Sequence, residues 1–314
     1  MFRGLTIYQL TQPVAAVMER LSEALADESR HFADCTPHSR KSTGFVSPLG
    51  LGSDVLSYET SAARLFCVRH DEKEIPAGAV KIALQAWRAG KEAEGEEVNK
   101  TDERIARDAL VEQMLPGAIP APSWTYAYLD KELSMLFVGA GEDGADQFIE
   151  WIKGPLQGCP FKLLGLNDLE ATDKFTEWLR SPEDSLPEDL SLGAACSLKH
   201  PQDGGTAINK ISHEDLNDAE YMPALLDAGY KCCQVALEHP QVNFAITANL
   251  GLRRLGLTDE VKAELEEHDS GVPADNRAAE FAAWVAGIRV ILAELEALLG
   301  GWPEQAMLDL GRGE

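Results

Sequence analysis

Residues 77–114 read AGAVKIALQAWRAGKEAEGEEVNKTDERIARDALVEQM, and this stretch organises the rest of the chain. It is rich in Ala, Glu, Lys and Arg, and it lacks the signals of a strand. Gly95 and Asn99 interrupt it, so the pattern predicts two helices, at about 77–93 and 101–114. We therefore expect a helical hairpin that projects from a sheet.

The segments on both sides of the hairpin carry strand and helix patterns. Leu5, Ile7 and Leu10 are interspersed with polar residues, which is typical of a strand. Strands are expected near residues 4–10, 54–58, 64–70, 124–129, 133–138, 161–165, 190–199, 205–211, 230–238, 242–248 and 251–256. Helices are expected near residues 13–28, 144–153, 169–180, 215–228, 258–268 and 274–299. These elements predict an α+β fold with mixed or antiparallel sheets and flanking helices.

Glycine- and proline-rich stretches set the expected boundaries. Residues 44–50 look turn-rich, and residues 181–187 resemble a boundary loop. Thr101 is expected to cap the second helix of the hairpin. The predicted division is a central α+β region over 1–76 with 116–181, a helical tip over 77–115, a base α+β region over 182–300 and a tail over 301–314.

The chain is strongly acidic, with a formal net charge of -24 over 314 residues. Such a chain repels polyanions at long range, so it can bind DNA only if its cations gather on one surface. No apolar run approaches the roughly 20 residues that span a bilayer, and the N-terminus is too polar for a signal peptide. These features predict a cytoplasmic protein without a membrane partner.

The chain has six cysteines, and none forms a Cys-x-x-Cys pair. Cys232 and Cys233 are neighbours in a predicted strand, so their side chains point to opposite faces and are poorly placed to share a metal. The histidines are scattered, and a Gly-x-Ser-x-Gly nucleophile motif is absent. We therefore expect buried free thiols, no metal, no cofactor and no enzymatic activity.

Short strings along the chain match, in order and spacing, those of one known family. They are FRGLTIY at 2–8, GFVSPLG at 44–50, EKEIP at 72–76, LPGAI at 115–119, TEWL at 176–179, DGG at 203–205, AG at 228–229, VAL at 235–237 and LRRL at 252–255. Together they are similar to the recombination-associated RdgC family, and the resemblance runs from residue 1 to about residue 299.

This resemblance implies a homodimer that closes into a ring, with a hole wide enough for double-stranded DNA. It also implies DNA binding with little sequence preference, on the nucleoid, and restraint of recombination by limiting access of the RecA recombinase. Contacts would go to the phosphate backbone, which positions a protein without specifying sequence. Leu115 and Ile119, at the exit of the tip, are the expected contacts of the ring-forming dimer.

The resemblance also directs attention to the cations of the base region. The expected DNA-binding residues are Lys199, Lys210, Lys231, Arg253 and Arg254, with His213 as a neutral donor. Three positions depart from the family pattern. Tyr230 stands where the family tends to have Lys, and Gly117 and Ile119 stand where it tends to have Arg and Phe. In a strand, a one-place shift such as that from Tyr230 to Lys231 moves the charge to the other face.

Two alternatives to DNA binding remain open. One is a protein-interaction module of the same fold that uses its acidity to contact DNA-binding proteins. The other is a nucleotide-binding enzyme, because Gly139, Gly141 and Gly144 form a Gly-x-Gly-x-x-Gly string before a predicted helix, with Asp168 further on. Carboxylates crowd that helix start and would oppose a pyrophosphate, so a glycine-rich turn is the favoured interpretation.

Overall fold

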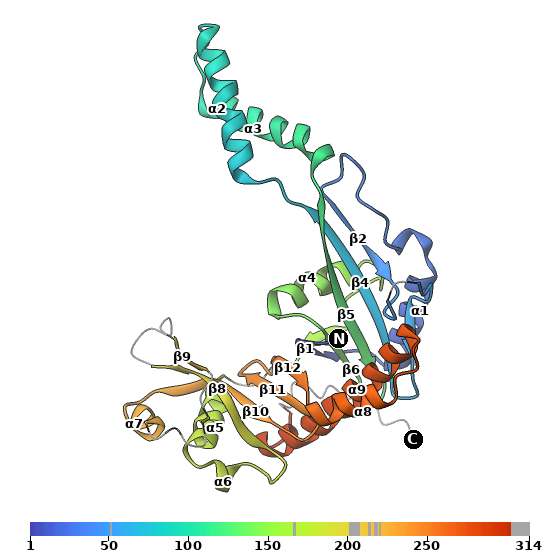
Figure 1. The fold of residues 1–314 in the computed structure, drawn as a ribbon, viewed down its shortest axis with the longest axis vertical. Helices are drawn as coiled ribbons and strands as arrows, with labels where there is room; N and C mark the ends of the chain where they lie inside the picture. The colour runs from blue at the N-terminus through green and yellow to red at the C-terminus, as the bar shows by residue number, and fades with distance from the viewer. Residues whose placement is uncertain are drawn as a thin grey trace. The chain divides into compact units, whose positions relative to one another are not determined.

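Figure 1 shows a computed structural model of the chain, which describes residues 1–50, 52–165, 168–200, 208–212, 215–216, 219 and 221–302. The chain forms two compact units, each of which is described by itself. The sheet unit consists of Met1–Ala26, Ser47–Phe66 and Tyr126–Glu314, and the hairpin unit of Asp27–Val46 and Cys67–Thr125. Strands β4 (Ala63–Lys73) and β5 (Pro120–Asp130) have residues in both units.

The sheet unit holds most of the strands and the longest helix. Its other strands are β1 (Gly4–Leu10), β3 (Ser57–Glu59), β6 (Met135–Val138), β7 (Phe161–Leu163), β8 (Ser191–Lys199), β9 (Ile208–Ser212), β10 (Lys231–Glu238), β11 (Val242–Thr247) and β12 (Leu252–Leu257). Its helices are α1 (Val14–Ala26), α4 (Glu142–Ile152), α5 (Asp168–Arg180), α6 (Pro182–Ser185), α7 (Met222–Asp227), α8 (Asp259–Glu267) and α9 (Pro273–Leu299).

The strands pair in antiparallel fashion throughout the described ladders. The strand order is β2-β4-β5-β6-β1-β12-β11-β10-β8-β9, with β3 on β4 and β7 on β1. Two register shifts in the β10–β8 ladder, one of them between Cys232 and Gln234, mark bulges that bend this part of the sheet. The expected α+β class with antiparallel pairing is thus confirmed.

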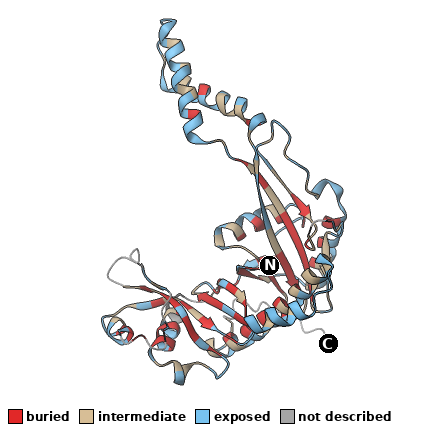
Figure 2. Cartoon of the chain, in the orientation of Figure 1, coloured by how far each residue is buried: buried red, intermediate tan, exposed pale blue. Residues whose placement is uncertain are grey.

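One face of the β8–β10–β11 ladder is buried under helices α5 and α9. Val235 and Ile246, which are paired neighbours on that face, are fully buried. They join Phe175 of α5 and Ile288 of α9 in the main hydrophobic core, which Figure 2 shows as buried segments. A side chain on Gly287 would come within 2.4 Å of Val242, so this glycine lets α9 approach β11 closely.

A buried ion pair ties α9 to the turn between β5 and β6. Asp130 is fully buried, and its two carboxylate oxygens accept hydrogen bonds from Arg289 Nε and a terminal nitrogen, each at 2.7 Å. The backbone N–H groups of Glu132 and Leu133 donate to the same carboxylate. Asp130 holds the pKa of Arg289 above its usual range through the hydrogen bonds. The pair therefore fixes the last helix to the sheet.

The hairpin unit contains β2 (Lys41–Val46), helices α2 (Ala77–Ala93) and α3 (Lys100–Met114), and the 3-10 turns at Glu28–Arg30 and Leu115–Gly117. Figure 1 shows α2 and α3 as the helical hairpin that the sequence predicts. Val80 is the buried residue of α2, and Ala106 that of α3, so the hairpin buries little apolar surface.

Lys73 anchors the exit of the hairpin. Its side chain is only 4% exposed, and its ammonium donates to the backbone carbonyl oxygens of Thr36, Pro37 and Leu115 at 2.8, 3.1 and 3.1 Å. These three acceptors satisfy all three N–H bonds of the ammonium, which is the condition for burying such a charge.

We expect Lys73→Met to destabilise the hairpin unit by about 2 kcal/mol, because the substitution removes the three hydrogen bonds that the charged ammonium donates. Thermal unfolding and amide hydrogen exchange over residues 67–125 measure this loss. Lys81→Met, at an exposed position of α2, is the matched control and should leave protection unchanged. Equal protection in both variants would contradict the anchoring role.

Four local expectations are wrong. Asn99, not Thr101, caps α3: its side chain accepts from the N–H groups of Thr101 and Asp102, and Asp102 reciprocates in a capping box. Residues 44–46 lie in β2 rather than in a turn, because Gly44 lets the backbone of Phe32 come close.

The other two corrections concern short helices. The helix expected at 215–228 spans only Met222–Asp227, since Pro223 suits a first helical turn. The loop expected at 181–187 contains the one-turn helix α6, closed by the bond from Ser185 N–H to Ser181 O. Neither change alters the order of the strands around them.

Candidate nucleic-acid interface

Three of the predicted DNA-binding lysines lie on one face of the sheet. Ser197 of β8 pairs with Lys210 of β9, and Lys199 of β8 pairs with Lys231 of β10. Paired residues point to the same face, and so do residues two apart in one strand. We call this the polar face; it carries Ser197, Lys199, Lys210, Lys231, Gln234, Thr247 and Arg253.

The row across four strands shows how continuous the polar face is. Lys210, Ser197, Gln234 and Thr247 are successive cross-strand partners on β9, β8, β10 and β11. The polar members Ser197, Gln234 and Thr247 do not follow from the sequence alone, because pairing and bulges decide which residues meet. Their alternation with buried neighbours is the only signal that sequence offers.

Arg253 belongs to the same face but is held down against it. It pairs in register with Ala245 of β11, whose neighbour in register on β10 is Ala236. Its guanidinium donates to the carbonyl oxygens of Leu5 and Leu252 at 3.2 and 3.1 Å. The side chain retains 24% exposure, so part of the guanidinium reaches solvent.

Arg254 differs from the other four predicted residues. It is exposed but has a left-handed backbone with φ of 51°, at the extra residue that shifts the β11–β12 register. This bulge removes Arg254 from the regular alternation, so the pairing does not assign it to the polar face. His213 lies outside the described residues.

Tyr230 occupies the position where the resemblance leads one to expect Lys. Its ring stacks edge-on against His200 with centroids 5.0 Å apart, and His200 Nε2 is 3.2 Å from the carbonyl oxygen of Ala228. Tyr230 also packs partly against the main core. It therefore makes a packing contact beside Lys231, and Lys231 supplies the cation at the start of β10.

The neighbouring cysteines differ in burial. Cys232 is fully buried, whereas Cys233, at the β10 bulge, is half-buried, and the bulge means that the pairing does not test whether the two side chains point to opposite faces. Burial raises the pKa of Cys233 although Lys199 opposes the shift, and burial raises the pKa of Cys196 to about 12. At neutral pH these thiols are uncharged, so they add no negative charge to the polar face.

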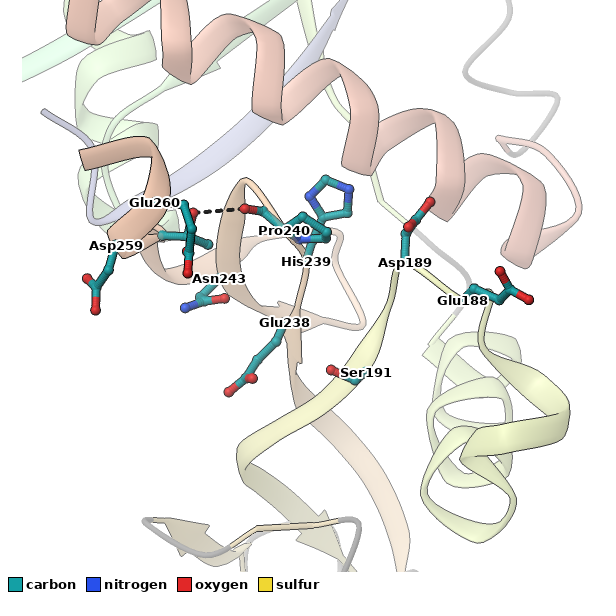
Figure 3. Close-up of a pocket in the computed structure, with 10 residues that line it drawn as sticks. Glu188, Asp189, Ser191, Glu238, His239, Pro240, Asn243, Asp259 and Glu260 are labelled. Atoms are coloured by element: carbon teal, nitrogen blue, oxygen red, sulfur yellow. Dashed lines mark hydrogen bonds between the residues drawn. The ribbon is translucent and has the colours of Figure 1, made fainter. Parts of the chain in front are cut away.

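The opposite end of β10 is acidic. Figure 3 shows a pocket of about 570 Å³ there, lined by Glu188, Asp189, Ser191, Glu238, His239, Pro240, Asn243, Thr258, Asp259 and Glu260. Five of these residues are carboxylates. Lys231 and Glu238 bound β10 and are seven residues apart, roughly 23 Å at about 3.3 Å per residue. The carboxylates that line this pocket thus lie at the end of β10 opposite Lys231.

The glycine-rich string 139–144 follows β6, which pairs in antiparallel fashion with β5 as the second arm of a hairpin. A side chain on Gly139 would come within 2.8 Å of the carbonyl oxygen of Tyr126, so packing accounts for that glycine. Glu142, in the first turn of α4, accepts a hydrogen bond from Asn249 and lies 3.7 Å from Arg253. The side chain of Asp168 lies outside the described residues.

The two residues expected at a dimer contact have different surroundings. Ile119 is 85% exposed, whereas the side chain of Leu115 is buried in the hairpin unit and its carbonyl accepts from Lys73. Gly117 closes the 3-10 turn between them and has open space at its Cβ position. Of these two residues, Ile119 is therefore the one whose apolar side chain is accessible to another molecule.

Neither a membrane span nor a metal-binding cluster occurs in the described part of the chain. No helix there is both long enough and apolar enough to cross a membrane. In the same residues, no group of three or more His, Cys, Asp or Glu side chains is arranged to hold a metal ion.

Comparison with known proteins gives one family over almost the whole chain. The family model described as "Putative exonuclease, RdgC" matches residues 1–302. Relatives named recombination-associated protein RdgC include those of Halorhodospira halophila, at 29% identity, Tolumonas auensis, at 28%, and Proteus mirabilis, at 25%. Each comparison covers 96% of this chain and 98–99% of the relative.

The chain is an α+β protein with an antiparallel sheet, a polar face that carries lysines and a helical hairpin. The chain belongs to the RdgC family of recombination-associated proteins. The resemblance found in the sequence strings is confirmed.

Proposed function

We propose that this protein binds double-stranded DNA without sequence preference through the phosphate backbone, using the polar face of the sheet unit. The observation that carries the proposal is the pairing that brings Lys199, Lys210 and Lys231 to one face, with Arg253 beside them. Lysine and arginine side chains neutralise phosphates wherever they lie along a duplex, so the contact is independent of base sequence.

The charge distribution supports this proposal despite the net charge of -24. Carboxylates line the Glu238 end of the sheet, while the lysines lie at the Lys231 end. The two ends lie roughly 23 Å apart, more than one Debye length of about 10 Å at 0.1 M salt, so the repulsion from the acidic end is largely screened where a duplex would lie over the lysine end.

A salt titration of duplex binding tests the proposal. Affinity should fall steeply with salt, with a log–log slope of about -0.9 per neutralised phosphate, reaching about -3.6 per protomer if all four cations engage. Duplexes of unrelated sequence should give the same affinity. An absence of binding even at about 20 mM salt would favour the alternative of a protein-interaction module.

We propose further that the protein acts as a ring-forming homodimer on the cytoplasmic nucleoid and restrains RecA. The exposed Ile119 supports a contact between copies of the chain, and the relatives' names support a role in recombination. Sedimentation of Ile119→Asp should shift a dimer toward monomer. Pre-bound protein should slow RecA-driven strand exchange on the same duplex.

The description of the family model as an exonuclease names a different activity. We propose that the protein is not an enzyme and uses no cofactor. Incubation of end-labelled duplex with the protein and Mg²⁺ should leave the label intact at protein concentrations that saturate binding. Release of labelled nucleotides would overturn this part of the proposal.

A further inference from the structure

Two of the four cations on the polar face are paired with carboxylates from neighbouring helices. Lys231 Nζ lies 2.8 Å from Asp173 of α5, and a terminal nitrogen of Arg253 lies 3.7 Å from Glu142 of α4. In the described part of the chain, no carboxylate forms an ion pair with Lys199 or Lys210. The polar face therefore has two paired cations and two others.

The Asp173 pair draws Lys231 away from the polar face. Helix α5 packs on the buried face of β10, where Phe175 shares the core with Cys232 and Val235. The strand register, by contrast, puts Lys231 on the polar face beside Lys199. Because the Lys231 ammonium lies 2.8 Å from the Asp173 carboxylate, the Lys231 side chain bends past the start of β10 toward the face that α5 covers.

The Glu142 pair is held in place by a third residue. Asn249 Nδ2 donates to the same Glu142 oxygen at 3.3 Å, and that oxygen is the one near Arg253. Because Leu5 and Leu252 hold the guanidinium from the other side, Arg253 has little freedom to leave the carboxylate. A phosphate approaching Arg253 meets the negative charge of Glu142 beside it.

We propose that Asp173 and Glu142 act as caps that withhold Lys231 and Arg253 from DNA phosphates. This inference rests on the proposed function and assigns a regulatory role to two carboxylates outside the expected binding set. Each phosphate contact with a capped cation requires the carboxylate to be displaced first. The capped face binds through Lys199 and Lys210, and release of the caps adds two contacts.

The caps make a quantitative prediction about salt dependence. The natural protein should show a log–log slope nearer to about -1.8 per protomer, for two phosphates, than to about -3.6. Asp173→Asn and Glu142→Gln keep the shape of each side chain and remove its charge. Each should tighten duplex binding about two- to fivefold, and the double variant should approach the steeper slope.

A matched control separates the caps from a general effect of net charge. Glu150 on α4 pairs with Lys153, the residue after that helix, at 2.6 Å, and Glu177 pairs with Lys174, also on α5, at 3.7 Å. The double variant Glu150→Gln with Glu177→Gln therefore removes one negative charge from each of the same two helices, as the double cap variant does. Melting temperatures of all variants should match that of the natural protein, which shows that the fold is retained.

Each outcome decides between the two proposals. Tighter, more salt-sensitive binding by the cap variants than by the control supports the caps. If the natural protein binds DNA and the cap variants bind like the control or more weakly, the caps are refuted and the DNA-binding proposal stands. Binding by the double cap variant alone supports the caps and refutes DNA binding by the unmodified chain. No binding by any variant refutes both.

Discussion

Replacing Lys199 and Lys210 together by Ala is expected to weaken duplex-DNA binding about thirtyfold at low salt. These two lysines point from β8 and β9 to the same face and have no ion-pair partner among the described carboxylates. Each phosphate contact is taken as about 1 kcal/mol, a charge-assisted bond less its solvation cost, so two contacts give about that factor. The log–log salt slope should become shallower by about 1.8 per protomer.

The control for this pair uses lysines of the same unit that lie on or directly after helices. Lys153, half-buried after α4, and Lys174, exposed on α5, are already paired with glutamates of those helices. Lys153→Ala with Lys174→Ala changes the net charge equally and should leave both affinity and slope within twofold of the natural protein, or about 0.4 kcal/mol. Equal losses in the two double variants would mean that the average charge, not the polar face, governs binding.

Replacing Arg289 by Met is expected to cost about 3–5 kcal/mol of folding stability, because it leaves the buried carboxylate of Asp130 without a positive partner. Asp130 is fully buried, and Arg289 supplies the two 2.7 Å bonds that compensate its charge. The two backbone donors that remain, at Glu132 and Leu133, do not neutralise that charge. Thermal or denaturant unfolding of the sheet unit measures the loss.

A second variant and a surface control make this stability prediction decisive. Asp130→Asn combined with Arg289→Met removes the unpaired buried charge, so the double variant should recover part of the stability that Arg289→Met loses. Arg180 forms an exposed pair with Asp227, and Arg180→Met should cost less than about 1 kcal/mol. If Arg289→Met cost no more than Arg180→Met, the buried pair would not be what holds α9 to the β5–β6 turn.

The elements that sequence predicts well are those whose stability is local. Helix α2 has the expected bounds, because its helix-forming composition and the break near Gly95 are local signals. Strand β1 spans the predicted residues, because its apolar and polar residues alternate. The sequence does not predict strand β2, because Gly44 resembles a turn residue. A side chain at position 44 would collide with the backbone of Phe32, which lies twelve residues earlier in the chain. Non-local packing of this kind leaves no local signal.

The candidate site also combines features that the sequence predicts with features that depend on non-local contacts. The cations themselves could be named from the sequence, but their common face depends on strand pairing and on the bulge between Cys232 and Gln234. The cap on Lys231 comes from Asp173, which is 58 residues away in the chain. Local charge counting finds acids near every lysine, so it could not have selected Asp173 or Glu142 as partners.

The centre of the polar face is built from very small side chains. Gly193 lies so near Ala236 that a side chain there would come within 3.1 Å of it, and Ala245 is the partner of Ala236 on the next strand. At these three positions no large side chain protrudes that could enter a groove of a double helix. A rod-like polyanion lying on the polar face could glide lengthwise, exchanging one phosphate for the next at equal energy.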